Sequence, residues 1–134
     1  MVGTPVIIDL WRNGAKEMSA VEGVRFAREG RTYLKYERKD EDDIVKSLLT
    51  VAHDEIRIRQ SGGVDADMHF RPERKADLIY STTYGRMFFL IETRSISSEI
   101  SSDIIRVRLD YSILTEDNEE VGANEVLIEA RLVK

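Results

Sequence analysis

Residues 56–96 have the sequence IRIRQSGGVDADMHFRPERKADLIYSTTYGRMFFLIETRSI, and this stretch decides the fold class. Runs in which apolar and polar residues alternate are separated by three breaks, at residues 61–63 (SGG), 71–75 (RPERK) and 84–85 (YG). Alternation with a period of two predicts β-strands, and short glycine-containing or charged breaks predict the turns between them. We therefore expect consecutive β-hairpins here.

The same alternation continues on both sides of this stretch. It predicts further strands over residues 5–11, around 24–26 and 33–36, and over 105–113 and 126–132. The chain would then hold about eight to ten short strands joined by tight turns. Because an antiparallel sheet of this size leaves open edges unless it closes on itself, we predict an all-β fold, a closed antiparallel β-barrel, with a β-sandwich as the alternative.

Three segments do not show simple alternation. Residues 15–22 (AKEMSAVE) are compatible with a helical turn, although the segment is too short to hold as a helix unaided. Residues 44–52 (IVKSLLTVA) fit either a helix or a strand, and we favour a strand because a hairpin partner follows directly. Residues 87–91 (MFFLI) are apolar on both faces, which predicts a strand that is covered on both sides.

The composition limits the classes of protein to consider. A chain of 134 residues without cysteine is expected to form a single domain, residues 1–134, without disulfides or thiolate metal sites. Its net charge of −5 argues against general nucleic-acid binding, which needs a basic surface. No apolar run approaches the ~20 residues of a membrane-spanning helix, and the first residues lack the pattern of a signal peptide. We therefore expect a cytoplasmic protein that binds neither nucleic acid nor membranes.

Several motifs occur in the order and spacing of a known family. They are Ser61-Gly62-x-Val64 and Met68-x-Phe70, then Tyr80-x-Thr82-x-Tyr84-Gly85, with Thr93 and Ile96 downstream. With these motifs the chain resembles the YwiB-like family of small, uncharacterised bacterial proteins, over roughly residues 5–133. The resemblance implies a calycin-like or lipocalin-like barrel, and it implies no activity.

Two positions depart from the pattern of that family. Gln60 stands where a basic residue often precedes Ser-Gly, and Thr83 stands where a proline commonly precedes the aromatic-Gly pair. The first departure concerns any polar site near that turn, whereas the second concerns only the local backbone.

Basic and aromatic side chains on the predicted strands are the candidates for ligand binding. Guanidinium groups bind carboxylates and phosphates through paired hydrogen bonds, and a small barrel can hold one small ligand. The candidate ligand-binding residues are Arg57, Arg59, His69, Tyr80, Tyr84, Arg106 and Arg108.

Two orientations of these arginines are compatible with the pattern. In one, the apolar faces fill the barrel and the arginines face water, paired with Glu92, Glu99 or Glu129. In the other, some arginines point inward and bind the anionic group of a ligand. Because burying an unpaired charge is costly, the first orientation is favoured. The aromatic side chains likewise either fill a core or line a cavity.

No arrangement in the sequence predicts catalysis or metal binding. Ser61 precedes two glycines, but the G-x-S-x-G pattern of a nucleophilic serine is absent. Asp65, Asp67 and His69 are the nearest approach to a metal site, and Arg71 on the same strand face as His69 disfavours a cation there. We expect no enzyme, no metal and no cofactor.

The sequence therefore favours a binding module for a small apolar or anionic ligand. The alternative is a solid barrel that serves as a structural or protein-interaction module, with neither ligand nor catalysis. The candidate partners are accordingly a small molecule and, as a homodimer, a second copy of the chain.

Overall fold

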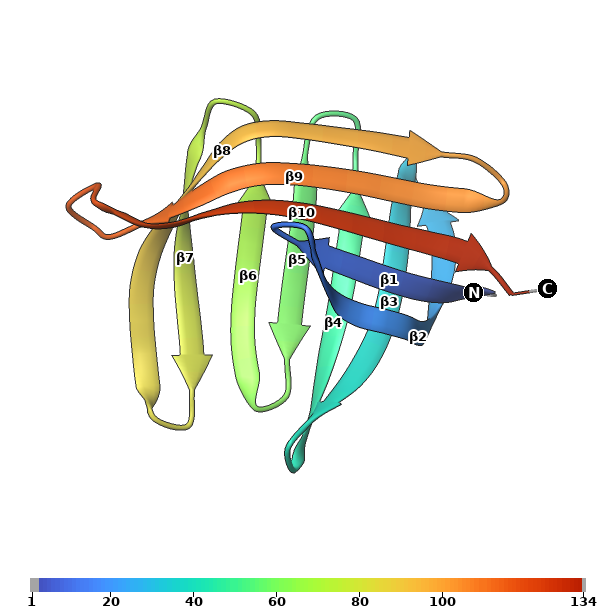
Figure 1. The fold of residues 1–134 in the computed structure, drawn as a ribbon, viewed down its shortest axis with the longest axis horizontal. Helices are drawn as coiled ribbons and strands as arrows, with labels where there is room; N and C mark the ends of the chain where they lie inside the picture. Colours follow the sequence, from blue (N-terminus) through green and yellow to red (C-terminus); the bar gives the residue numbers. More distant parts are fainter. Residues whose placement is uncertain (1–2, 134) are drawn as a thin grey trace.

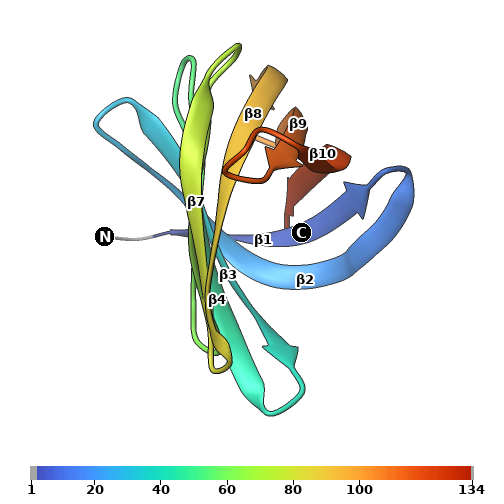
Figure 2. The same cartoon turned by 90° about the vertical axis from the view of Figure 1, so that its left-hand side faces the viewer.

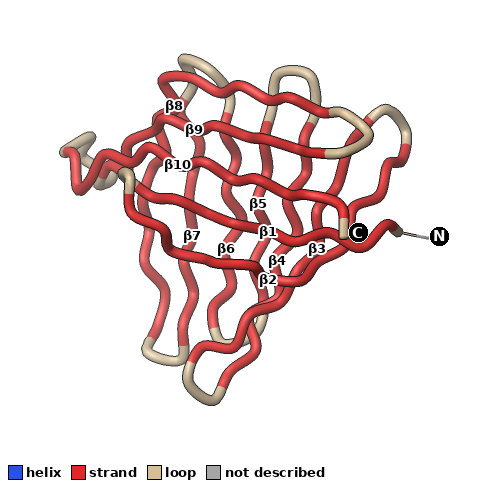
Figure 3. Tube along the Cα trace, turned by 45° about the vertical axis from the view of Figure 1, so that its right-hand side comes forward, coloured by secondary structure: helices blue, strands red, loops and turns tan. Residues whose placement is uncertain are grey.

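A computed structural model describes residues 3–133, and every regular element in this range is a β-strand (Figure 3). The strands are β1 (Thr4–Arg12), β2 (Ala15–Arg28), β3 (Arg31–Asp40), β4 (Asp43–Val51), β5 (Ile56–Ser61), β6 (Val64–Phe70), β7 (Lys75–Thr82), β8 (Gly85–Ile100), β9 (Ile104–Leu114) and β10 (Glu120–Leu132). They form a closed antiparallel barrel in which β10 pairs with β1, which confirms the predicted fold (Figure 1). In residues 3–133 there is no helix with the length and hydropathy needed to cross a membrane.

The barrel is flattened into two layers whose strands cross. In Figure 1, β3 to β7 run vertically, while β9, β10 and β1 run across them in the other layer. The long strands β2 and β8, of 14 and 16 residues, curve from one layer to the other, as the view from the side shows for β2 (Figure 2). Such long curved strands allow a sheet to close without a free edge.

One end of the barrel is filled and the other is open. The filled end carries the β2–β3, β4–β5, β6–β7 and β8–β9 turns, and next to them lie the fully buried side chains of Val51, Ile56, Phe70 and Ile105. The ring of Phe70 meets the ring of Tyr111 edge-on, with centroids 4.8 Å apart. The remaining five turns, including β1–β2 and β9–β10, surround the open end.

Turn chemistry fixes the register of the hairpins. Asn13 and Gly14 between β1 and β2 both have positive φ, as a type I′ hairpin turn requires. Gly62 has a φ of 91°, and a Cβ atom there would lie 2.2 Å from the carbonyl oxygen of Ile44. The Ser61-Gly62-Gly63 break is therefore a tight corner that no larger residue could form without moving the backbone of β4.

Residues 15–22, which the sequence leaves compatible with a helical turn, form the first half of β2 instead. Leu10 pairs with Met18 and Ile8 pairs with Val21, so a bulge adds one residue to β2 between these pairs. Met18 and Val21 both pack on the core although they are three positions apart. A bulge in a strand thus imitated the spacing of a helix.

Two other expectations for single strands have different outcomes. Residues 44–52 do contain a strand, β4, as we favoured. The prediction that residues 87–91 are covered on both faces is wrong, because Met87 is 46% exposed and Phe88 is 51% exposed. Phe88 points to the outer face, and Met87 lies at the open end of the barrel, where no further layer of the core covers it.

The bulge in β2 is held by the buried carboxylate of Asp9 in β1. Asp9 Oδ1 accepts the backbone N–H of Ala20, which has positive φ, at 2.8 Å. Asp9 also pairs with Lys16 (3.4 Å) and with Arg131 of β10 (2.8 Å). The hydrogen bond from Ala20 is the largest cause that lowers the pKa of Asp9, and the two cations add to it against the opposing effect of burial.

Removal of the buried Phe70 ring should cost far more stability than removal of an exposed ring. We expect Phe70→Ala to lower the free energy of unfolding by about 3–5 kcal/mol, because a cavity remains and the contact with Tyr111 is lost. The matched variant Phe88→Ala should lower it by less than about 1 kcal/mol. Urea unfolding measures both values, and equal losses would contradict this assignment of the core.

Asp9 should make stability depend on pH. Since its pKa in the folded state is depressed, its stabilising contribution is present above the usual carboxyl range of about 4 and is lost as the pH falls through the lower folded-state pKa. We expect Asp9→Asn to cost about 1–3 kcal/mol at neutral pH and progressively less in acid.

Urea unfolding at several pH values tests the role of Asp9, with Asp77→Asn on the exposed face of β7 as the control. A constant difference between wild type and Asp9→Asn at all pH values would disprove it.

Candidate functional site

The open end of the barrel contains a cavity of ≈ 440 Å³. Its lining consists of inward side chains that lie beyond the filled core. All ten strands contribute to it, β10 only through Val121 near its start. Eight of the lining residues are apolar: Val45, Val64, Met68, Leu78, Met87, Phe89, Ile113 and Val121. Tyr111 lies between this cavity and the core, because its ring packs on Phe70 while its residue also lines the cavity.

Arg12 is the most firmly held charged group of the cavity. It continues the inward series Val6, Ile8 and Leu10 along β1, and this places it inside the barrel at the open end. Its Nε donates to Glu17 Oε2 at 2.7 Å, and its Nη1 donates to the hydroxyl of Tyr111 at 3.1 Å and to Asn124 Oδ1 at 3.3 Å.

The surroundings of Arg12 keep it charged. Burial lowers the pKa of its guanidinium group, but the interactions with Tyr111 and Glu17 outweigh burial and leave the pKa above its ordinary value. Nearby, burial raises the pKa of the Tyr36 hydroxyl, so this residue remains a neutral phenol. The cavity thus contains the charged guanidinium group of Arg12, which Glu17, Tyr111 and Asn124 hold in place.

Three further polar residues complete the lining: Arg38 at the end of β3, Gln60 at the end of β5 and Tyr80 at the end of β7. Glu17 is the carboxylate among the described lining residues. A mainly apolar cavity with a few polar groups directed into it is the usual form of a small-molecule site.

Of the seven residues proposed from the sequence, the cavity contains Tyr80. Arg57 and His69 lie together on the outer face, where Arg57 Nε donates to Asp67 Oδ1 at 2.8 Å and His69 Nδ1 lies 3.0 Å from Glu55 Oε1. The pKa of Asp67 is lowered mainly by its hydrogen bond from Arg57, and that of Glu55 mainly by its hydrogen bond with His69.

The remaining candidates are also on the outside. Arg106 pairs with Glu99 at 2.7 Å and with Glu129 at 3.3 Å, which are two of the carboxylates expected from the sequence. Arg108 borders an outer groove beside Trp11 of β1. Tyr84 is 99% exposed at the tip of the β7–β8 turn.

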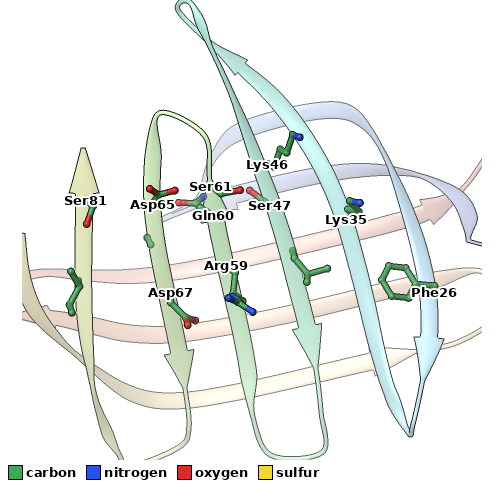
Figure 4. Close-up of a pocket in the computed structure, with 13 residues that line it drawn as sticks. Phe26, Lys35, Lys46, Ser47, Arg59, Gln60, Ser61, Asp65, Asp67 and Ser81 are labelled. Atoms are coloured by element: carbon green, nitrogen blue, oxygen red, sulfur yellow. The ribbon is translucent and has the colours of Figure 1, made fainter. Parts of the chain in front are cut away.

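Arg59 lies in a second, broader depression of ≈ 640 Å³ on the outer face of the barrel. Figure 4 shows its residues spread over β2 to β7, with Lys35 and Lys46 on one side and Asp65 and Asp67 on the other. Because this surface follows the outside of one sheet and carries both signs of charge, it defines no single ligand. The cavity at the open end of the barrel, which has side chains from all ten strands around it, is therefore the better candidate site.

Arg12, Glu17, Arg38 and Tyr111 line the cavity but were not among the candidates expected from the sequence. The sequence pattern does indicate that the two arginines point inward. Arg12 stands two residues after the inward Leu10, and Arg38 stands two residues after the inward Tyr36. The first predicted strand ended at residue 11, one residue too early to include Arg12.

With this geometry in place, comparison with known proteins identifies the family. The family model described as "Domain of unknown function (DUF1934)" matches residues 9–128. The chain belongs to this family. This DUF1934 chain is 22% identical over 98 residues to the "Uncharacterized beta-barrel protein YwiB" of Bacillus subtilis (strain 168), and the match covers 73% of this chain and 69% of that protein.

The fold of this DUF1934 chain is also that of a solved relative. The crystal structure of the YwiB protein from Bacillus subtilis matches it with a TM-score of 0.85 at 18% identity, over 98% of this chain and 94% of that chain. At this level of identity the likeness establishes the fold alone. The resemblance to the YwiB-like family is therefore confirmed, and the function has to be argued from the site.

Proposed function

We propose that this DUF1934 protein is a non-catalytic binding protein that holds a small, largely apolar ligand in the open end of the barrel. The observation that carries the proposal is the ≈ 440 Å³ cavity with eight apolar residues in its lining. Ligand sites in proteins usually have volumes of about 300–1,000 Å³.

The filled end of the barrel supports the same proposal. Fully buried Ile56 and Phe70 give the cavity a rigid base, so a ligand would enter a preformed space instead of competing with a collapsing core. Met68 and Met87 add flexible, polarisable surface that adapts to different apolar shapes. A ligand that covers Met87 and Val121, which are 46% and 59% exposed, would remove their apolar surface from water.

The neutral fluorescent dye N-phenylnaphthylamine tests the proposal. Its fluorescence should rise on binding to the wild-type protein, and native mass spectrometry should show one bound molecule. Met87→Trp should lower the affinity at least about tenfold, because the larger side chain fills the open end at a position exposed enough to accept it.

Ile44→Trp is the matched control for the dye experiment. Ile44 is 54% exposed at the same end of the barrel, next to the cavity residue Val45 but on the opposite strand face, so this variant should bind the dye normally. Absence of dye binding to the wild type, or equal affinity of Met87→Trp and wild type, would overturn the proposal.

A second candidate function, association with another copy of the chain, rests on a different observation. Ile79 of β7 and Phe88 of β8 form a cross-strand pair on the outer face and are 46% and 51% exposed. Contiguous exposed apolar surface marks many contact sites between proteins, and this pair would form the centre of one.

Light scattering over a range of protein concentrations tests this association. A dimer that Phe88→Glu converts to a monomer, while Ile44→Glu leaves it intact, would support the second candidate. A wild-type protein that stays monomeric throughout would exclude it.

A further inference from the structure

The way in which Arg12 is held leaves part of its guanidinium group unused. Nε is bound to Glu17, and Nη1 is bound to Tyr111 and Asn124. These three hydrogen bonds fix the plane of the group, while Nη2 has no hydrogen-bond partner among the side chains that the structure describes. A guanidinium group that is fixed from one side offers the other side to an anionic oxygen.

The charged residues of the cavity lie on one side of the barrel, and the side across from them is mainly apolar, although β7 contributes Tyr80 there. The neighbouring strands β1, β2 and β3 contribute Arg12, Glu17 and Arg38. Across the barrel, β6 and β8 contribute Met68 and Phe89. A ligand that fits both sides has a charged or polar end and an apolar body.

The sign of the charge follows from the balance within the cavity. Arg12 and Arg38 are its basic residues, and Glu17 is the carboxylate among the described residues that line it. This local excess of positive charge occurs in a chain with a net charge of −5. The apolar side reduces the contact of Arg12 with water, and its side chain is 38% exposed, so its attraction for an anion is less screened than on an open surface.

We propose that the ligand is an amphiphilic organic anion whose carboxylate or sulfonate group binds Arg12 on the β1–β3 side while its apolar body lies against Met68 and Phe89. This inference rests on the proposed function, since it uses the same cavity. It adds the chemical class of the ligand and the residue that selects it.

Two pairs of probes differ only in the charged group: anilinonaphthalene sulfonate against N-phenylnaphthylamine by fluorescence, and octanoate against octanol by competition. The wild type should bind the anionic member of each pair more tightly. Arg12→Gln should weaken the binding of both anions about tenfold, because it removes a charge-assisted interaction, and should leave the neutral probes unchanged.

Glu17→Gln provides an independent test that does not depend on the stability of the Arg12 variant. It removes the negative charge beside Arg12 and keeps an oxygen that can accept its Nε–H. Glu17 is 39% exposed at its side chain, so the change should not disturb the core. We expect several-fold tighter binding of anilinonaphthalene sulfonate and octanoate.

Arg86→Gln is the matched control, since Arg86 is exposed on the outer face next to the cavity residue Met87. It should leave all four affinities unchanged. If the neutral dye binds and Met87→Trp blocks it, but the anionic probes bind no more tightly and do not respond to Arg12→Gln or Glu17→Gln, this inference is overturned while the proposed function stands. If no probe binds the wild type, both are overturned.

Discussion

The pairing of β1 with β10 is the constraint on which the rest of the structure depends. The register runs from Val6 opposite Leu132 to Arg12 opposite Val126, and it turns an open sheet into a closed barrel. At the end of the seam, the backbone N–H of Val133 donates to the carbonyl of Pro5 at 3.3 Å. Without this pairing both strands would be exposed edges that could pair with other chains.

The same seam also arranges the polar groups around it. On the outside, Arg131 of β10 reaches Asp9 of β1, and Asp9 in turn holds the bulge of β2. On the inside, Arg12 reaches Asn124 of β10 and Tyr111 of β9. Closure therefore brings Arg12 against Tyr111 and Asn124, although about a hundred residues separate it from them in the sequence.

The interior of a barrel widens with the number of strands, and in this ten-strand barrel the inward side chains fill only one end. Here Phe70, Ile56 and Ile105 fill one end, and the other keeps a space bordered by Met68, Phe89 and other apolar residues. The barrel is therefore solid at one end and hollow at the other. Outside the cavity, charged side chains form ion pairs on the outer face, as those of Arg57 and Arg106 show.

The sequence by itself predicted most of the strands and turns, because period-two alternation and turn residues are local properties, and it favoured a closed antiparallel barrel over a sandwich. It did not reveal the bulge at Ala20, where two inward residues stand three apart, nor the exposure of Phe88. The local pattern predicts that the side chains of a strand alternate between two faces. It does not predict which charged side chains lie on the inner face, or at which end of the barrel they lie. Of the candidate residues expected from the sequence, Tyr80 lines the cavity. Arg12, Glu17 and Arg38 are brought together there by the tertiary structure, because strand closure and register join residues that are distant in the chain.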